Sequence, residues 1–315
     1  MANTTLVSKP AAGTDPAIET RAAVKHYGAV HAVDGVDLTV ARGEIFGLIG
    51  HNGAGKSTLF KMMLGLIEPS AGQILVNGVS VAGRDFRAAR RSIGYLPENV
   101  VLYDNLSGLE TLRFFAKLKG APSAQCEPTL ARVGLADAAR RPVREYSKGM
   151  RQRLGFAQAL LGAPRVLFLD EPTNGLDPQA IRDFYAILHD LQDNGVTILI
   201  TSHILAELQE RVNRLAIMAA GRIQAIGSVQ ALRDQMQMPL VLALRLAPHD
   251  VADAQAFIQT VSGATSIQTA EGLHVSCPRQ SKMVVLGALA GLGTKLLDLD
   301  IQEPSLEDVF FGFSD

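Results

Sequence analysis

The stretch EIFGLIGHNGAGKSTLF, residues 44–60, decides the fold of this chain. Its first residues are apolar and predict a short strand, and its last residues predict a helix that continues to about Leu66. Between them, Gly50–Ser57 fits the phosphate-loop pattern G-x-x-x-x-G-K-[S/T], which binds nucleotide phosphates in this strand–turn–helix context. We therefore predict an α/β fold in which a phosphate group binds at the start of the helix.

The loop supplies the chemical groups that phosphate binding requires. Gly53 and Gly55 allow the backbone to curl so that successive N–H groups face phosphate oxygens. Lys56 brings a positive charge to the β- and γ-phosphates, and Ser57 offers a hydroxyl to Mg²⁺. The nucleotide-binding residues predicted from this loop are Gly50, His51, Asn52, Gly53, Ala54, Gly55, Lys56, Ser57 and Thr58.

Two later stretches place polar side chains at the ends of predicted strands. RVLFLDEP, residues 165–172, puts Asp170 and Glu171 directly after four apolar residues. Ligands of parallel sheets bind at this edge, so we expect Asp170 to hold Mg²⁺ and Glu171 to take a proton from an attacking water. TSHI places His203 at the end of a further strand. An isolated histidine there is usually structural, but its position after two matched motifs favours a role in orienting the water.

A second element suited to an anion is YSKGMRQRLG, residues 146–155. Ser147 and Gly149 precede a basic, amphipathic helical run, and backbone N–H groups at such a helix start attract negative charge. A plain capped helix would explain the fold of this stretch. It would not explain why a chain with a complete phosphate loop carries a second such element.

Composition limits the classes of function. The 315 residues are 47% hydrophobic and carry a net charge of −1, so no strongly basic surface predicts nucleic-acid binding. The two cysteines, Cys126 and Cys277, fit no metal-ligand spacing and are expected to be reduced core residues. We find neither an apolar run of the roughly 20 residues that span a bilayer nor a secretion signal.

Changes in pattern along the chain predict three segments. Residues 1–19 are expected to form a flexible tail, 20–234 a nucleotide-binding domain, and 235–315 an accessory or regulatory domain. Within the second segment, antiparallel strands at its start accompany a parallel sheet, and about 87–162 are expected to form an inserted helical subdomain. The third segment has the βαββαβ order of a ferredoxin-like domain. It ends in PSLEDVFFGF, where Ser305 and Asp308 have capping-box spacing.

These motifs, taken in order over Arg21–Val229, resemble the ATP-binding subunit of an ABC transporter. The resemblance implies that Tyr27 stacks on adenine, although the residue pattern alone favours a packed strand tyrosine. It implies that Glu98, in place of the family's usual glutamine, helps to hold Mg²⁺ and takes part in catalysis. It also implies a signature, a D-loop and a head-to-tail homodimer around two MgATP, in which each chain's signature faces the partner's ATP. In this chain those residues are Ser147, Lys148, Gly149 and Met150 in the signature and Asp177 in the D-loop, where the pattern also predicts a helix N-cap before Pro178.

The narrower resemblance is to ATPases of ABC-2 export systems. GYLPENVVLYDNLSGLETLRFFAKLKG and YSKGMRQRLGFAQALLG are most similar to the ATPase of nitrous-oxide-reductase maturation, which serves assembly of a copper–sulfur centre. This implies a peripheral protein on the cytoplasmic side of the inner membrane that drives a separate ABC-2 permease. A periplasmic accessory protein would be contacted only through that permease.

Other functions are weighed against this one. The alternatives within the family are the ATPase of another ABC-2 exporter, for a drug, lipid or polysaccharide, and a weakly hydrolysing regulatory subunit. Outside the transporters, a DNA-repair ATPase would need long coiled-coil insertions, and a translation factor would normally carry two cassettes. A phosphotransfer kinase would have no use for YSKGM.

Overall fold

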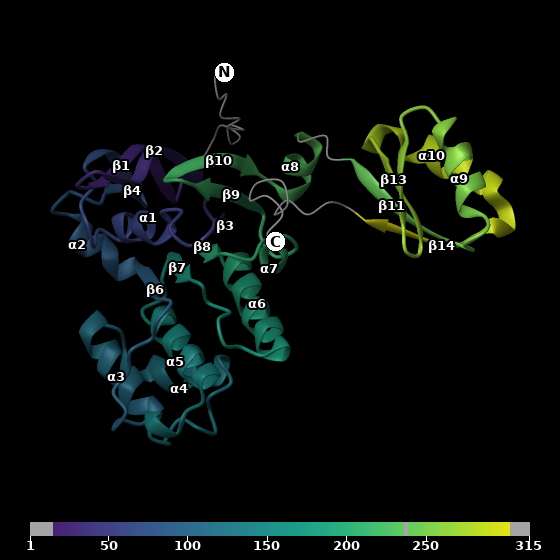
Figure 1. Cartoon of the computed structure of the whole chain (residues 1–315). Coiled ribbons are helices and arrows are strands. Elements are labelled where there is room, and N and C mark those ends of the chain that lie inside the picture. The colour runs from purple at the N-terminus through teal and green to yellow at the C-terminus, as the bar shows by residue number, and fades with distance from the viewer. Residues whose placement is uncertain (1–14, 236–238, 303–315) are drawn as a thin grey trace. The chain divides into compact units, whose positions relative to one another are not determined.

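The computed structural model describes residues 15–235 and 239–302, and the chain divides into two compact units after Ser228 (Figure 1). Most of the predicted N-terminal tail lies outside the described residues. The predicted capped turn at Ser305 and Asp308 lies outside them as well.

The first unit is built on a six-stranded sheet in the order β10-β9-β3-β8-β7-β6. All neighbouring strands are parallel except β10, which pairs antiparallel to β9. Strands β3 and β7 are buried along their whole length, as expected for parallel strands that are covered on both faces. The strands are β3 (Ile45–Ile49), β6 (Ile93–Leu96), β7 (Val166–Asp170), β8 (Thr197–Ser202), β9 (Arg214–Ala219) and β10 (Arg222–Gly227).

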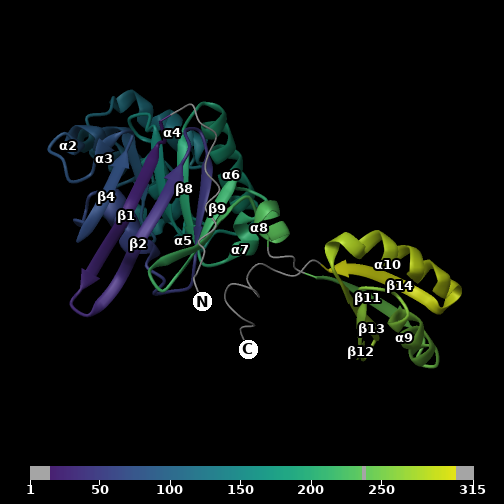
Figure 2. The ribbon, with the colours of Figure 1, turned by 90° about the horizontal axis from the view of Figure 1, so that it is seen from above.

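A second, four-stranded antiparallel sheet in the order β2-β1-β4-β5 belongs to the same unit (Figure 2). Helix α1 (Lys56–Met63) lies between the two sheets, and its apolar residues join both in one core (Figure 1). On α1, Phe60 packs edge-to-face on Phe168 of β7 at 5.5 Å between ring centres. The strands are β1 (Ile18–Tyr27), β2 (Val30–Val40), β4 (Ala71–Val76) and β5 (Val79–Ser80).

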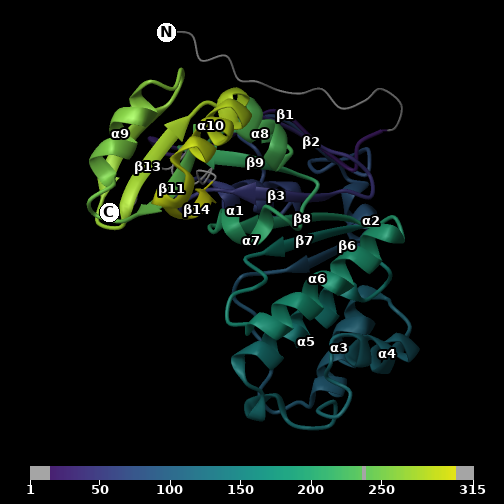
Figure 3. The same ribbon diagram turned by 90° about the vertical axis from the view of Figure 1, so that its right-hand side faces the viewer.

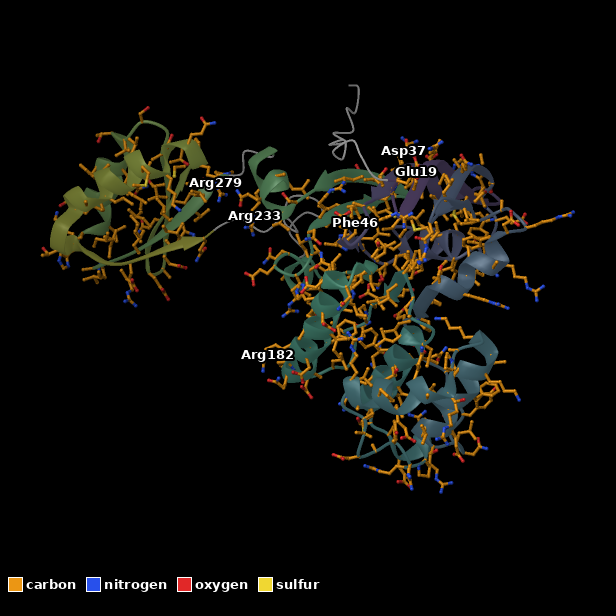
Figure 4. All side chains as sticks on the ribbon, turned by 180° about the vertical axis from the view of Figure 1, so that it is seen from behind. Glu19, Asp37, Phe46, Arg182, Arg233 and Arg279 are labelled. Carbon is orange, nitrogen blue, oxygen red and sulfur yellow. The ribbon has the colours of Figure 1, made fainter. Side chains whose placement is uncertain are left out.

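Strand β3, which leads into the phosphate loop, is anchored to its neighbour β9. Phe46 is fully buried in the interior of the first unit (Figure 4), and the Arg214 guanidinium lies 5.5 Å from its ring centre. The same arginine pairs with the buried carboxylate of Glu44 at 3.4 Å. These contacts fix the strand that positions the loop.

Helices cover the other face of the six-stranded sheet (Figure 3). The predicted helical segment contains the three longer helices α3, α4 and α5, but within it Ile93–Leu96 form strand β6 of the main sheet. This strand pairs with β7 and packs on α5 through Gly94, where a Cβ would lie only 2.2 Å from the Ala159 carbonyl oxygen. The helices of the unit are α2 (Phe86–Ala89), α3 (Gly108–Lys119), α4 (Cys126–Arg132), α5 (Lys148–Leu160), α6 (Pro178–Asp193) and α7 (Leu205–Leu208).

In its described residues, the second unit has three α-helices and a small antiparallel sheet in the strand order β12-β13-β11-β14. Its own core includes alternate residues of β11, such as Leu242 and Leu244, together with Val285 of α10. Its elements are α8 (Val229–Gln235), β11 (Leu240–Leu246), α9 (Val251–Gln259), β12 (Thr265–Thr269), β13 (Gly272–Cys277), α10 (Lys282–Leu289) and β14 (Leu296–Gln302). Short 3-10 turns complete the two units at Arg90–Ser92, Ser123–Gln125, Val143–Glu145, Arg279–Ser281 and Ala290–Lys295. In the part of the chain that the structure describes, no helix has the length and apolar character needed to cross a membrane.

The Phe60–Phe168 contact generates a prediction for stability. Phe168→Ala should lower the free energy of unfolding of the first unit by about 3–5 kcal/mol, because it leaves a cavity between α1 and β7. Urea unfolding followed by circular dichroism measures the change. Phe114→Ala, at a side chain that is 39% exposed, is the matched control and should cost less than half as much. Equal losses in the two variants would contradict the packing described.

Candidate functional site

Three neighbouring strands end at one edge of the main sheet. Ile49 of β3 lies opposite Ser202 of β8, and Thr201 of β8 lies opposite Asp170 of β7. Because the strands are parallel, the segments that follow them leave from the same edge. The phosphate loop, the acidic pair and His203 are thereby brought together from distant parts of the chain.

The phosphate loop is held close to the surrounding backbone at two glycines. A Cβ on Gly50 would lie 2.3 Å from the Met218 carbonyl oxygen, and one on Gly55 would lie 2.2 Å from the Ala32 carbonyl oxygen. Gly55 also has a φ of +104°, a left-handed conformation that side chains disfavour. On the outer side of the loop, Gly53 has a φ of +84° but faces open space. The cradle that the pattern predicts therefore exists as a backbone shape that only glycine fits at two positions.

Lys56 begins α1 and is 6% exposed. Its ammonium group donates hydrogen bonds to the carbonyl oxygens of Gly50 and His51, and it lies 4.0 Å from Glu171 Oε1. Burial lowers the pKa of Lys56, and the carboxylates of Glu171, Asp170 and Glu98 oppose that shift. The amine is thus placed between the loop and the acidic strand end.

Asp170 and Glu171 are both buried, and one hydroxyl ties them together. Thr201 Oγ1 donates to Asp170 Oδ1 at 2.6 Å and accepts from the Glu171 backbone N–H at 3.0 Å. Burial raises the pKa of Asp170, the Thr201 hydrogen bond opposes that rise, and the charges of Glu171 and Glu98 add to it. Glu171 has a φ of +47°, which is unusual for a residue with a side chain.

His203 completes this first cluster. Its Nδ1 lies 2.8 Å from Glu171 Oε2, and its side chain is 42% exposed. The following turn is held by Ser202, whose hydroxyl donates to the Ile204 carbonyl oxygen and accepts from the Ile204 N–H. The imidazole therefore lies at the open side of the cluster, in contact with the carboxylate predicted to accept a proton.

Glu98 and Tyr27 are both exposed, at or just beyond the end of a strand. Glu98 is exposed just beyond β6, and its charge acts on both Lys56 and Asp170. Tyr27 ends β1 and is 50% exposed, with Lys25 Nζ 5.4 Å from its ring centre. The expectation from residue pattern alone, that Tyr27 is a packed strand residue, is wrong. A tyrosine at the tip of a two-strand hairpin has no neighbouring layer to cover it.

The predicted signature and D-loop residues form a second cluster. Ser147 caps α5 by accepting a hydrogen bond from the Met150 N–H at 3.2 Å, and Lys148 is exposed beside it. The stem of Lys148 lies over Gly175, where a Cβ would be 2.8 Å from Lys148 Cδ. Asp177 caps α6 by accepting from the Ala180 N–H at 2.8 Å, as its place before a proline predicts. The starts of the two helices are thus in contact through Lys148 and Gly175.

Sequence patterns missed several residues that shape the first cluster. Thr201 could have been noticed as a polar residue at the buried end of the apolar run TILITS. Met218 and Gly221 could not, because strands β9 and β10 carry no motif. Gly221 donates its N–H to the Ala54 carbonyl oxygen at 3.0 Å and so supports the phosphate loop.

The groups present suit a metal-bound triphosphate. The side chains near the loop that could hold a cation are the Ser57 hydroxyl and the carboxylates of Asp170 and Glu98, an all-oxygen set of the kind that Mg²⁺ prefers. Among the described residues, no group of three or more His, Cys, Asp and Glu side chains could hold a metal ion. Mg²⁺ needs no such cage, since it usually takes one or two protein carboxylates together with water and phosphate oxygens.

Comparison with known proteins gives concordant matches. The sequence model of the family described as "ABC transporter" matches residues 33–174. The mouse protein "ATP-binding cassette sub-family A member 7" is 38% identical over 294 residues, which are 90% of this chain. The chain spans only 14% of the length of that relative.

Two other matches cover most of this chain and nearly all of the protein with which it is compared. "Daunorubicin resistance ATP-binding protein DrrA3" of Streptomyces coeruleorubidus is 36% identical over 94% of this chain and 95% of its own length. The solved "Structure of ATP binding subunit of ABC transporter" superposes with a TM-score of 0.65 at 35% identity, covering 70% of this chain and 92% of the other.

The loop geometry generates a prediction that compares two glycines. Gly55→Ala should lower the melting temperature and weaken phosphate binding more than Gly53→Ala does. Both residues have positive φ, but only the first substitution drives a Cβ into the Ala32 carbonyl oxygen. Thermal unfolding and calorimetric titration with a nucleoside triphosphate measure the two effects. Equal effects would show that left-handed strain alone, and not the close backbone approach, sets the requirement for glycine.

Proposed function

The chain belongs to the ABC transporter family of ATP-binding subunits, and from this membership we propose that it hydrolyses ATP to drive a separate membrane permease of the ABC-2 export type. The observation that carries the proposal is the first cluster. There Glu171 lies between Lys56 at 4.0 Å and His203 at 2.8 Å, directly beside the phosphate loop. A structural ion pair would explain the lysine contact alone, but not the half-exposed imidazole on the other carboxylate oxygen.

Each residue has a chemical task in this proposal. Lys56 and the backbone N–H groups of residues 50–58 bind the β- and γ-phosphates of ATP and orient them. Ser57, Asp170 and Glu98 would hold Mg²⁺, which neutralises charge on the phosphate oxygens when bound. Glu171 accepts the proton of the attacking water, and His203 holds Glu171 and orients that water. Tyr27 offers an exposed ring to adenine.

We propose that two copies of the chain close head-to-tail around two MgATP. The second cluster supports this, because Ser147 and Lys148 are exposed at the start of α5, where the helix dipole favours an anion. Gly149, Met150 and Asp177 lie at the same helix starts. In the closed dimer this cluster contacts the partner's γ-phosphate, so loss of that phosphate weakens the dimer.

An exposed apolar surface follows Glu98 and suits the permease. Val101 is 87% exposed, and Tyr103 is 56% exposed and packs edge-to-face on Phe114 of α3 at 5.7 Å. Contiguous exposed apolar side chains mark interaction sites. We propose that this surface binds the permease, so that the chain acts as a peripheral protein on the cytoplasmic side of the membrane.

The class of cargo is proposed from the similarity to one named relative. The relative named for daunorubicin resistance matches over 95% of its length, which supports a drug or lipid exporter over maturation of the nitrous oxide reductase copper–sulfur centre.

We propose that residues 20–234 form the ATPase domain, with about 87–162 as its helical subdomain, and that 235–315 form a ferredoxin-like regulatory domain. The strand order β12-β13-β11-β14 supports that last assignment.

The proposed reaction is tested by Glu171→Gln. This variant should still bind MgATP and dimerise, while the ATPase rate falls at least about 100-fold, because an amide cannot accept the proton of the attacking water. Size-exclusion chromatography with ATP and a phosphate-release assay measure the two properties. Lys56→Ala is the matched control and should neither bind ATP tightly nor dimerise. Unchanged turnover in Glu171→Gln would remove Glu171 as the base, and an inactive wild-type complex with its permease would favour the weakly hydrolysing regulatory subunit.

The transporter assignment predicts a membrane partner. Affinity purification of the full chain from detergent-solubilised membranes should recover an integral membrane protein. Val101→Asp with Tyr103→Asp should abolish that recovery while ATP binding is retained, because two charges replace apolar contact area. Recovery of the same partner by the double variant would place the docking surface elsewhere. The identity of the partner also separates drug or lipid export from copper-site maturation.

A further inference from the structure

Thr201 contacts both acidic residues of the site, through the side chain of Asp170 and the backbone N–H of Glu171. It is the fifth residue of β8, fully buried, with Asp170 opposite it on one neighbouring strand and Leu48 opposite it on the other. Its environment is otherwise the apolar interior of the sheet. A hydroxyl in such a place must find partners, because an unpaired buried polar group is costly.

The two hydrogen bonds of the Thr201 hydroxyl have fixed directions. The Glu171 backbone N–H can only donate, so Thr201 Oγ1 accepts that bond at 3.0 Å. The hydroxyl proton is then free to be donated to Asp170 Oδ1 at 2.6 Å. The Thr201 hydroxyl therefore donates to one oxygen of the Asp170 carboxylate, and the other oxygen, Oδ2, is left for a cation.

The hydrogen bond from the Glu171 N–H to Thr201 holds the backbone at a strained position. The φ of +47° at Glu171 lies in the left-handed region, which a residue with a Cβ occupies only when its surroundings hold it there. Through this conformation the side chain reaches Lys56 with one oxygen and His203 with the other. The Thr201 hydroxyl holds the amide at the centre of that turn.

We propose that Thr201 is a positioning residue for ATP hydrolysis, whose single hydroxyl sets the Asp170 carboxylate and the Glu171 backbone in one fixed geometry. The inference deepens the proposed function and rests on it. Thr201 does not touch the reacting atoms in this account. It acts through the cation-holding carboxylate on one side and through the proton-accepting residue on the other.

The same strand provides a matched control. Thr197 is four residues earlier on β8, on the same face of the strand, and is 1% exposed. Its hydroxyl accepts from the Gly43 backbone N–H at 3.0 Å, at the opposite end of the strand from the site. Replacing either threonine by valine removes a buried hydroxyl and leaves one backbone N–H without its acceptor, but only one of the two changes affects the acids.

Three variants test the proposal in the full chain with its permease. Thr201→Val should lower kcat roughly 10- to 100-fold, the range expected for loss of a hydrogen bond to a charged group. At saturating Mg²⁺, KM for ATP should stay within about threefold of the wild-type value, because the loop and Lys56 are unchanged. Thr201→Ser should restore most of the lost rate, and Thr197→Val should keep a near wild-type kcat.

Two measurements on the isolated chain do not depend on turnover. Hydrogen exchange at the Glu171 amide should accelerate in Thr201→Val and stay near wild type in Thr201→Ser. Mn²⁺ titrated with a non-hydrolysable ATP analogue and followed by electron paramagnetic resonance should bind more weakly to Thr201→Val than to Thr197→Val. Both readouts remain informative if the wild-type complex turns out not to hydrolyse ATP, an outcome that would overturn the proposed function but not this geometry.

The outcomes that would overturn the inference are specific. A wild-type kcat in Thr201→Val, or equal losses in Thr201→Ser and Thr201→Val, would show that the hydroxyl does not matter. Equal losses in Thr197→Val would assign the effect to general strand stability. Unchanged Glu171 exchange and Mn²⁺ affinity in a folded Thr201→Val chain would contradict the two hydrogen bonds themselves.

Discussion

The register of three parallel strands is the constraint on which the site depends. Because Ile49 lies opposite Ser202 and Asp170 lies opposite Thr201, segments about 120 and 150 residues downstream of the phosphate loop reach the same sheet edge. Side chains alternate between the two faces of a strand, so a shift of one residue between β7 and β8 would turn Asp170 and Thr201 away from each other. Burial on both faces of these strands makes such a shift costly. The arrangement of the site residues therefore depends on the packing of the strands that carry them.

The site carries more negative than positive charge, and this excess fits the proposed ligand, ATP with a divalent cation. Lys56 is surrounded by the carboxylates of Asp170, Glu171 and Glu98, and burial acts against every charge that is enclosed. A bare triphosphate would add negative charge to this surplus. A divalent cation would offset both the carboxylates and the phosphates, so the charge balance supports the proposed use of magnesium. Glu98 enlarges the surplus relative to a site with glutamine.

Local patterns predicted much of this structure, and contacts between distant segments account for what they missed. The phosphate loop, the strand ending in Asp170 and the cap at Asp177 each depend on a few consecutive residues, and the structure has these elements where predicted. Strand β6 falls within the segment predicted to be helical because its four residues, Gly94 among them, carry little periodicity, and its pairing with β7 decides its conformation. Thr201 acquires its importance only from a partner on another strand.

The contact between Lys148 and Gly175 has a consequence for communication within the proposed dimer. Gly175 lies in the loop that follows Glu171, while Lys148 stands at the surface offered to the other copy. A displacement of that loop would change its contact with the lysine stem. In the proposed dimer, each copy would transmit the state of its own nucleotide to the pocket that it helps its neighbour to close, so ATP hydrolysis in the two pockets would be coupled.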